Sequence, residues 1–163
     1  MMIRKFVGAL ALLVIGMVPA GAQDSGIVGS WRTQISIPGR PQGDIFGVMA
    51  VGADGTMHYS DLTQVIPQQV GDAISAFAFT TTSIGVWAKA QNGYALTHVE
   101  LLANIDSSFF GACTTDFAVQ LSADGKQFTG TATFTCEDAT GQQAGPPATE
   151  PISGKRIGVN LSH

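Results

Sequence analysis

The chain of 163 residues contains little charge, few histidines and only two cysteines. Its 8 Lys and Arg are outnumbered by 12 Asp and Glu, and no stretch interleaves basic with aromatic residues, so the surface that binds a phosphate backbone is missing. Of the three histidines, His163 is the last residue, and His58 and His98 are too few and too far apart to predict a metal site. We therefore expect neither a nucleic-acid partner nor a bound metal.

Sequence motifs of catalysis are also absent. The chain has no G-x-S-x-G nucleophile turn and no glycine-rich phosphate loop, so we predict no cofactor and favour a protein without enzymatic activity. Apart from the N-terminus, no apolar run is long enough to suggest a membrane-spanning helix, and we expect no such helix in the chain.

Residues 1–22 have the pattern of a secretory signal peptide. Arg4 and Lys5 precede an apolar run from 6 to 18, which is too short to span a bilayer, and the small residues Ala20 and Ala22 suit cleavage before the next residue. We expect a signal peptide over 1–22 and one domain over 23–163. The protein is then exported to the periplasm or out of the cell.

The two cysteines stand at equal distances from the turn dipeptide Asp124-Gly125. A hairpin closed at that dipeptide pairs residues whose numbers sum to 249, which sets Cys113 directly opposite Cys136. The same register places Phe117 and Phe134 on the cysteine face and a row of threonines on the other face. We predict a disulfide, as suits an exported protein, on a face that points into the protein interior.

Elsewhere, segments rich in Thr, Val, Ile and Phe are separated by Gly, Asp-Gly and Asn-Gly turn signals, which predicts an all-β chain. Sequential hairpins favour an eight-stranded antiparallel up-and-down barrel, because closure removes exposed edges. The interior of such a barrel is either filled by side chains or holds one small ligand. The expected strands are 30–37, 44–51, 56–62, 84–90, 94–103, 112–122, 127–137 and 150–159.

The connection 63–82 after the third strand is too long for a hairpin loop and rather apolar. It predicts a short helical lid, with an irregular packed connection as an equal alternative. Pro67 suits the first turn of that helix. The residues that would share one helical face are Ile66, Val70, Ile74 and Phe77.

Gly29-Ser30-Trp31 resembles the G-x-W start of the first strand in calycin barrels, the superfamily of lipocalins and avidins. In that superfamily a late Arg packs across this Trp, and Arg156 stands at the matching place. The segments 83–87 and 127–131 look like motifs of small bacterial lipocalin-like proteins. The resemblance implies a ligand-carrying barrel in which Trp31 and Arg156 form a structural closure pair.

The first strand, 26–34, is also similar to that of the avidins, and the segment 52–55 adds to the likeness, which ends there. Biotin-binding members have several later tryptophans and a late Asp, whereas Trp87 is the only later tryptophan here and the last strand has no such Asp. Thr33 stands where the avidins place an Asn. We expect no biotin binding.

The orientation of His98 and Glu100 decides whether the interior contains groups that transfer protons. A two-residue turn at Asn92-Gly93 pairs residues whose numbers sum to 185, which puts Ala88 and Val99 inside and both His98 and Glu100 outside. A three-residue turn would instead place His98 and Glu100 inside as a possible general-base pair. We favour the first, because an unpaired buried carboxylate is costly.

We expect an exported carrier of a small apolar ligand, with a cavity lined by Phe117, Phe134, Ala88, Val99, Met49 and Tyr59. One alternative is a small-barrel cyclase or isomerase, in which His98 with Glu100, or His58 with Tyr59, transfers protons. Another is a fully packed barrel that acts as an interaction module.

Overall fold

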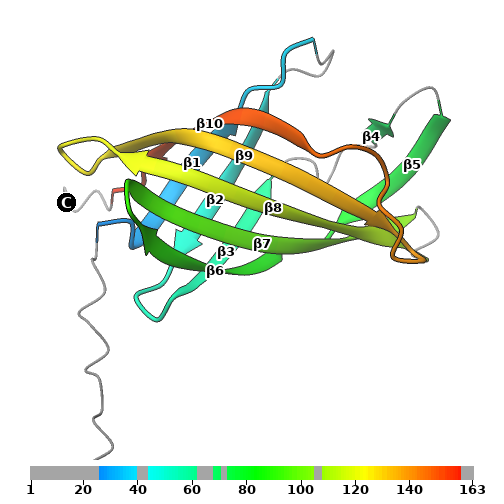
Figure 1. Cartoon of the computed structure of the whole chain (residues 1–163), viewed down its shortest axis with the longest axis horizontal. Helices are drawn as coiled ribbons and strands as arrows, with labels where there is room; N and C mark the ends of the chain where they lie inside the picture. Colours follow the sequence, from blue (N-terminus) through cyan, green and yellow to red (C-terminus); the bar gives the residue numbers. More distant parts are fainter. Residues whose placement is uncertain (1–25, 40–43, 62–67, 71–72, 105–107, 159–163) are drawn as a thin grey trace, which may run out of the picture.

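The computed structural model describes residues 26–39, 44–61, 68–70, 73–104 and 108–158, and these ranges contain strands and no α-helix (Figure 1). The predicted signal peptide, 1–22, lies outside the described residues. The strands are β1 Gly29–Ile35, β2 Ile45–Val51, β3 Thr56–Asp61, β4 Gln68–Val70, β5 Ala73–Thr80, β6 Ser83–Ala90, β7 Gly93–Asn104, β8 Phe109–Leu121, β9 Gln127–Asp138 and β10 Ala148–Arg156.

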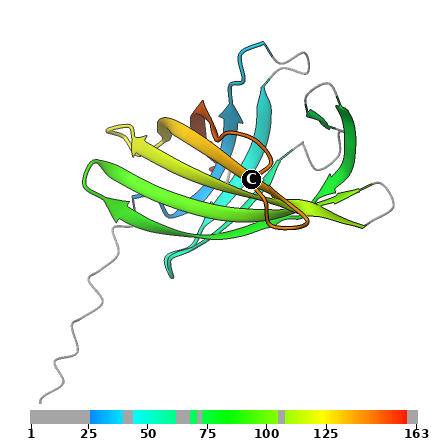
Figure 2. The same cartoon turned by 45° about the vertical axis from the view of Figure 1, so that its right-hand side comes forward.

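Eight of these strands close into an antiparallel barrel, seen from two directions in Figures 1 and 2. Around the ring, β1, β2, β3, β6, β7, β8, β9 and β10 each pair with the next, and β10 returns to β1. Neighbouring barrel strands also follow one another along the chain, apart from the β4–β5 insertion. The predicted eight-stranded, all-β, up-and-down barrel is confirmed, and each predicted strand end lies within three residues of the observed one.

The segment predicted as a helical lid forms a strand hairpin instead. β4 pairs with β5, and β5 pairs with the end of β7 at Leu102–Asn104, beyond the last residue of β7 that pairs with β6 (Figure 1). Because this overhang leaves backbone groups of β7 without a partner in β6, strand pairing there competes with helix formation. The helix prediction is wrong for Val70, Ile74 and Phe77, which lie in β4 and β5, whereas Ile66 and Pro67 lie outside the described residues.

The two ends of the barrel differ. The turn end carries the tight turns after β2, β6 and β8, and the loop end carries the β9–β10 connection and the disulfide. Large side chains fill the turn end: Trp31 packs edge-on against Phe128 with ring centroids 5.1 Å apart, and Trp87 packs against Tyr94 at 5.9 Å. The other buried members of this core include Ile27, Met49, Val51, Met57, Leu96, Phe117 and Val119. Burial of this apolar surface is the main favourable contribution to the barrel's stability.

Arg156 connects the first and last strands of the barrel across the β1–β10 seam. It is the register partner of Trp31, and its guanidinium lies 4.2 Å from the centre of the indole, as the sequence resemblance implies. Nη1 donates to the carbonyl of Val28, Nη2 to that of Gly26 and Nε to that of Gly125. The contact is therefore a structural one, since each of the three guanidinium nitrogens donates to a backbone carbonyl.

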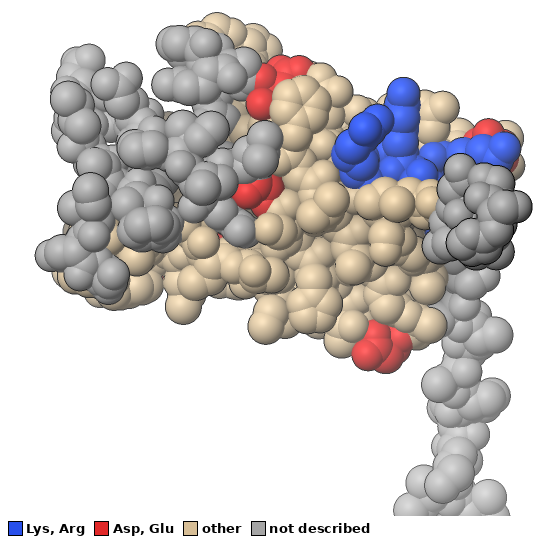
Figure 3. Space-filling view, turned by 180° about the vertical axis from the view of Figure 1, so that it is seen from behind, with Lys and Arg blue, Asp and Glu red and all other residues tan. Residues whose placement is uncertain are grey.

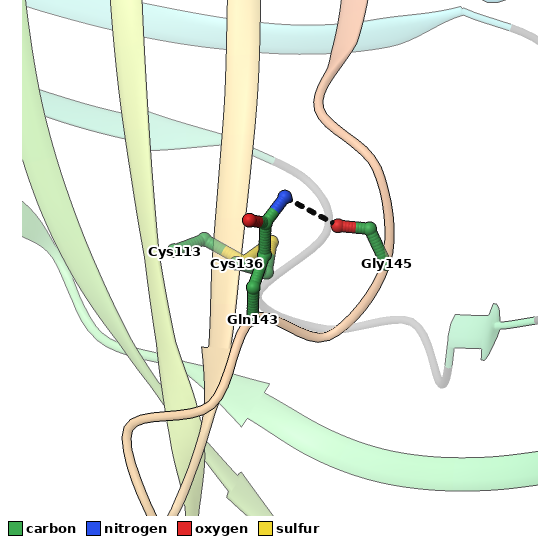
Figure 4. Close-up of a disulfide and its surroundings, with 4 residues drawn as sticks. All are labelled: Cys113, Cys136, Gln143 and Gly145. Carbon is green, nitrogen blue, oxygen red and sulfur yellow. Dashed lines mark hydrogen bonds between the residues drawn. A yellow bond between two sulfur atoms is a disulfide. The ribbon is translucent and has the colours of Figure 1, made fainter.

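The β8–β9 hairpin has the predicted register. Every pair sums to 249, and Cys113 and Cys136 are bonded directly across the strands. Phe117 faces inward and is 2 % exposed, while Asp116 faces outward. Figure 4 shows the disulfide beneath the β9–β10 connection, where the Gln143 side chain donates a hydrogen bond to the carbonyl of Gly145.

The predicted β6–β7 register and facing are both wrong. The strands pair with numbers that sum to 183, so Ala90 lies opposite Gly93 and the turn is Gln91-Asn92. Gly93 does not serve the turn: a Cβ there would lie 2.2 Å from the carbonyl oxygen of Val119, so the glycine allows β8 to approach.

A shift of two residues keeps the two face sets intact, and the facing is a separate error, because the set predicted to lie outside points inward. Ala88 and Val99 lie on the outer surface, and Trp87 and His98 lie inside. The inner set contains the largest side chains of the two strands, which are needed to fill the turn end. The smaller apolar side chains are left outside.

Candidate functional site

Polar side chains line the inner wall of the barrel between the aromatic core and the loop end. Four of them are at most 2 % exposed: Thr33 on β1, Ser83 on β6, His98 on β7 and Thr115 on β8. We call this set, with Tyr59 on β3 and Glu100 on β7, the inner polar belt. The residue types are unusual for a barrel interior, because buried polar groups are costly unless they are hydrogen-bonded.

Tyr59 lies at the centre of the belt. Its ring meets the imidazole of His98 edge-on, with centroids 4.9 Å apart, and packs against Phe117 at 5.7 Å. The hydroxyl of Thr33 donates a hydrogen bond of 3.3 Å to the phenol oxygen. Burial raises the pKa of Tyr59 above its ordinary value, so the phenol stays protonated and can donate a hydrogen bond.

His98 is a neutral imidazole in this environment. It is 2 % exposed, and burial lowers its pKa to about 4, although Asp116 on the outer face acts in the opposite direction. Phe117 packs against the ring with centroids 5.3 Å apart. A neutral imidazole has one donor and one acceptor nitrogen, so it can bind a group of either type.

Three buried polar atoms of the belt have no hydrogen-bond partner among the described residues. They are Ser83 Oγ, His98 Nδ1 and Thr115 Oγ1, on the adjacent strands β6, β7 and β8. His98 and Thr115 are direct register partners. Each such atom costs about 1–3 kcal/mol when it is left without a partner. Together they form a place where a polar ligand atom or a water molecule gains hydrogen bonds that the protein does not supply.

Glu100 brings a titratable carboxyl to the loop-end side of the belt. It faces inward opposite Cys113, and burial, with the nearby Asp61 carboxylate as a second cause, raises its pKa to about 7. At neutral pH the carboxyl therefore exchanges readily between its acid and its base form. As pH rises past this value, ionisation of Glu100 makes this part of the interior more negative.

The remaining candidates of the sequence analysis are distributed over both faces. His58 is exposed on the outer surface while its neighbour Tyr59 is buried inside, so these two side chains do not form a proton-transfer pair. The expected outward orientation of His98 and Glu100 is wrong, as is the inward one of Ala88 and Val99. Met49 is in the core, Phe117 borders the belt, and Phe134 is half-buried opposite Thr115.

Sequence reasoning missed Ser83 and Thr33 as members of the site. Thr115 lies on the same face of β8 as Cys113, which is the inner one. One signal in the sequence could have predicted the inward orientation of His98. Trp87, Tyr94 and Leu96 share its face, and large side chains of this kind are usually buried in the core.

Within the described ranges, no group of three or more His, Cys, Asp or Glu residues lies close enough together to hold a metal ion. The same ranges include no helix with the length and hydropathy to cross a membrane.

No protein-family profile, curated protein or solved structure matches this chain. The closed barrel of eight antiparallel strands is compatible with a calycin-like fold. The function of the inner polar belt therefore has to be argued from its own geometry.

Proposed function

We propose that the protein is an exported barrel that binds a small molecule with an apolar body and an uncharged polar head group. The observation that supports this is that three of the four buried side-chain polar atoms without a partner among the described residues lie in the belt: Ser83 Oγ, His98 Nδ1 and Thr115 Oγ1. A purely structural barrel gains stability when such groups are replaced by apolar ones of the same shape. Their concentration on three adjacent strands suits a site that recognises the head group.

The charge of the surroundings favours an uncharged head group. His98 is neutral at physiological pH, and the carboxyl groups of Glu100 and Asp61 repel an anion. Tyr59 supplies a protonated phenol next to the imidazole. A hydroxyl, carbonyl or amide can exchange hydrogen bonds with these groups without bringing a charge into the interior.

The loop end is the natural entry for the ligand. The turn end is filled by the aromatic core. At the loop end Ile35, Ile45 and Ile152 are buried on β1, β2 and β10, whereas Glu100 on β7 and Phe134 and Cys136 on β9 are only partly buried. The ring of Phe134 and the disulfide offer apolar contacts to the body of the ligand. Burial of ~200 Å² of apolar ligand surface contributes roughly 5 kcal/mol before association costs, which supports dissociation constants of about micromolar or weaker.

Binding of the uncharged fluorescent dye Nile red, and its displacement by decanol or by decanoate, tests this proposal. At pH 8 decanol should displace the dye more effectively than decanoate, because the carboxyl of Glu100 is then ionised. Ser83→Ala and Thr115→Val remove two of the partnerless hydroxyls, and Thr131→Val, on the exposed outer face of β9, is the matched control.

The two inner variants should bind decanol about fivefold more weakly each, the equivalent of one neutral hydrogen bond, while their unfolding midpoints in urea stay unchanged or rise. The control should change neither quantity. If the inner variants lose stability and keep wild-type displacement curves, the hydroxyls serve packing and the proposal is wrong. Failure of wild-type protein to bind Nile red and to retain any small molecule in native mass spectrometry would also refute it.

An isomerase or cyclase is a second candidate, supported by the carboxyl of Glu100 with a pKa of about 7 two residues from His98 on the inner face. A group that titrates near neutral pH is suited to both steps of a proton transfer within one ligand. The test is to recover the molecule that copurifies with Glu100→Gln and incubate it with wild-type protein. A change in its isomer composition with wild type alone supports catalysis, and an unchanged molecule excludes it.

A further inference from the structure

The outer surface of the barrel carries a patch in which exposed cations and exposed apolar side chains lie together. We call it the seam patch: Arg32 on β1, Phe46 and Val48 on β2, Lys155 on β10, and Ile157 directly after β10. Figure 3 shows Lys and Arg side chains gathered on this side of the molecule, next to uncharged surface and with acidic atoms at the right-hand edge of the group. We propose that the seam patch docks the protein on a negatively charged lipid membrane surface, whatever molecule the interior binds.

The two cations of the patch are held side by side. Arg32 and Lys155 are direct register partners in the β1–β10 ladder, and both are exposed. Like charges directly opposite each other in a sheet are destabilising. No carboxylate among the described residues forms an ion pair with either, so the patch is locally positive on a chain whose formal net charge is −4. This arrangement is complementary to an anionic surface.

The apolar members of the patch stand beside these cations. Phe46 is 46 % exposed, Val48 is 51 % exposed and Ile157 is 49 % exposed. Val48 is the register partner of Arg32, so an alkyl group and a guanidinium are immediate neighbours. A shallow groove of about 330 Å³ lies between Phe46 and Lys155, over the backbone of β1 and β10.

This combination fits a membrane surface better than a soluble anion. Cations that lie level with exposed aromatic and aliphatic groups can bind lipid head groups while the apolar groups reach the acyl boundary. A small soluble anion would not use the exposed apolar side chains. The opposite side of the barrel gives a comparison within the same molecule, because the apolar residues Ile84, Val86, Val99 and Leu101 are exposed there and the outward residues of β6 and β7 include no Lys or Arg.

Vesicle flotation with the mature full-length chain tests the proposal, with phosphatidylcholine vesicles that contain or lack phosphatidylglycerol. The charge variant is Arg32→Gln with Lys155→Gln, and its control is Lys126→Gln in an exposed turn. The apolar variant is Phe46→Ser with Val48→Ser, and its control is Ile84→Ser with Val86→Ser on the opposite side. All these residues are exposed, so the fold should be kept, and far-ultraviolet circular dichroism checks that it is.

Wild-type protein should float with the anionic vesicles only, and salt should release it. Each basic residue near an anionic membrane strengthens binding about fivefold, so the charge variant should bind about 25-fold more weakly. The apolar variant should also bind more weakly, and both controls should match wild type. Nile red binding in the interior should be the same for all variants, which separates this proposal from the proposed function.

Three results would overturn the proposal. Wild-type protein could fail to float with anionic vesicles, or it could float equally with vesicles that lack phosphatidylglycerol. The charge variant could bind as wild type does. Full competition by soluble glycerol phosphate would assign the patch to free anions instead of a membrane.

Discussion

The guanidinium of Arg156 lies 4.2 Å from the centre of the Trp31 indole, directly across the seam where the last strand of the barrel meets the first. Its three hydrogen bonds reach backbone carbonyls in the segment before β1 and in the β8–β9 turn. One side chain thus holds together three parts of the turn end that are far apart in the sequence.

Arg156→Ala should lower the free energy of unfolding by about 3 kcal/mol, because a cation–π contact is lost and three carbonyls lose a charged donor. Arg156→Lys should recover less than half of this loss, since an ammonium cannot present the same fork of donors. Urea denaturation followed by tryptophan fluorescence measures both. Lys155→Ala, at the exposed neighbouring position, should stay within about 0.5 kcal/mol of wild type. An equally small effect of Arg156→Ala would contradict the structural role.

Gly154 makes room for the Phe128 ring in the core. A Cβ at this position would lie 2.2 Å from a ring carbon of Phe128, which itself packs against Trp31. Gly154→Ala should therefore cost about 1–3 kcal/mol of stability through overpacking. Gly158→Ala is the control, because no atom lies within 4 Å of its added Cβ. Thermal unfolding of the two variants should show a lower midpoint for the first alone.

His98 and Glu100 should have opposite effects on the pH dependence of the free energy of unfolding. Folding lowers the pKa of His98 to about 4, so the unfolded chain binds its proton more readily and stability rises with pH between about 4 and 6.5. Folding raises the pKa of Glu100 to about 7, so the folded state binds that proton more readily and stability falls between about 4.5 and 7. The contributions of the two residues should nearly cancel in the window they share.

Single variants should reveal this cancellation. In Glu100→Gln the free energy of unfolding should rise from pH 4 to 6.5, and in His98→Asn it should fall from pH 4.5 to 7, each by on the order of 2 kcal/mol. Urea midpoints measured across this range give both slopes. Parallel slopes in the two variants would show that these residues do not titrate as their burial implies.

The disulfide should stabilise the hairpin that carries the inner polar belt's Thr115. Its cysteines are 23 residues apart, and a loop of that length corresponds to about 3 kcal/mol in the chain-entropy description. Cys113→Ala with Cys136→Ala should lower the free energy of unfolding by up to that amount. Reduction of wild-type protein should give a similar shift, whereas the double variant should not respond to reductant.

The sequence was sufficient to predict the strands and one register, because the signals there were local. The equal spacing of Cys113 and Cys136 about Asp124-Gly125 left one hairpin that satisfied both the disulfide and the segregation of apolar residues. The β5 strand could not be found in this way, since its pairing depends on the overhang of β7, a property of the assembled sheet.

The predicted orientation of the candidate site was wrong for a related reason. The sequence pattern separates the two face sets of β6 and β7 correctly, but it predicts the more uniformly apolar set, with Ile84 and Val99, as the interior, and this is wrong. The structure buries the set with Trp87 and His98 because side-chain volume at the turn end decides the facing. This facing buries Glu100 at a cost in free energy, and the same carboxyl is the group of the site best suited to proton transfer.

The pairing of β5 with Leu102–Asn104 has a consequence for self-association. The overhang of β7 would otherwise present a row of open backbone donors and acceptors, to which a strand of another molecule could add. With β5 in place, the outermost strand of this extension is β4, which is three residues long. So short a strand is a poor template for intermolecular sheet growth, and the hairpin thus protects the barrel against aggregation through the exposed end of β7.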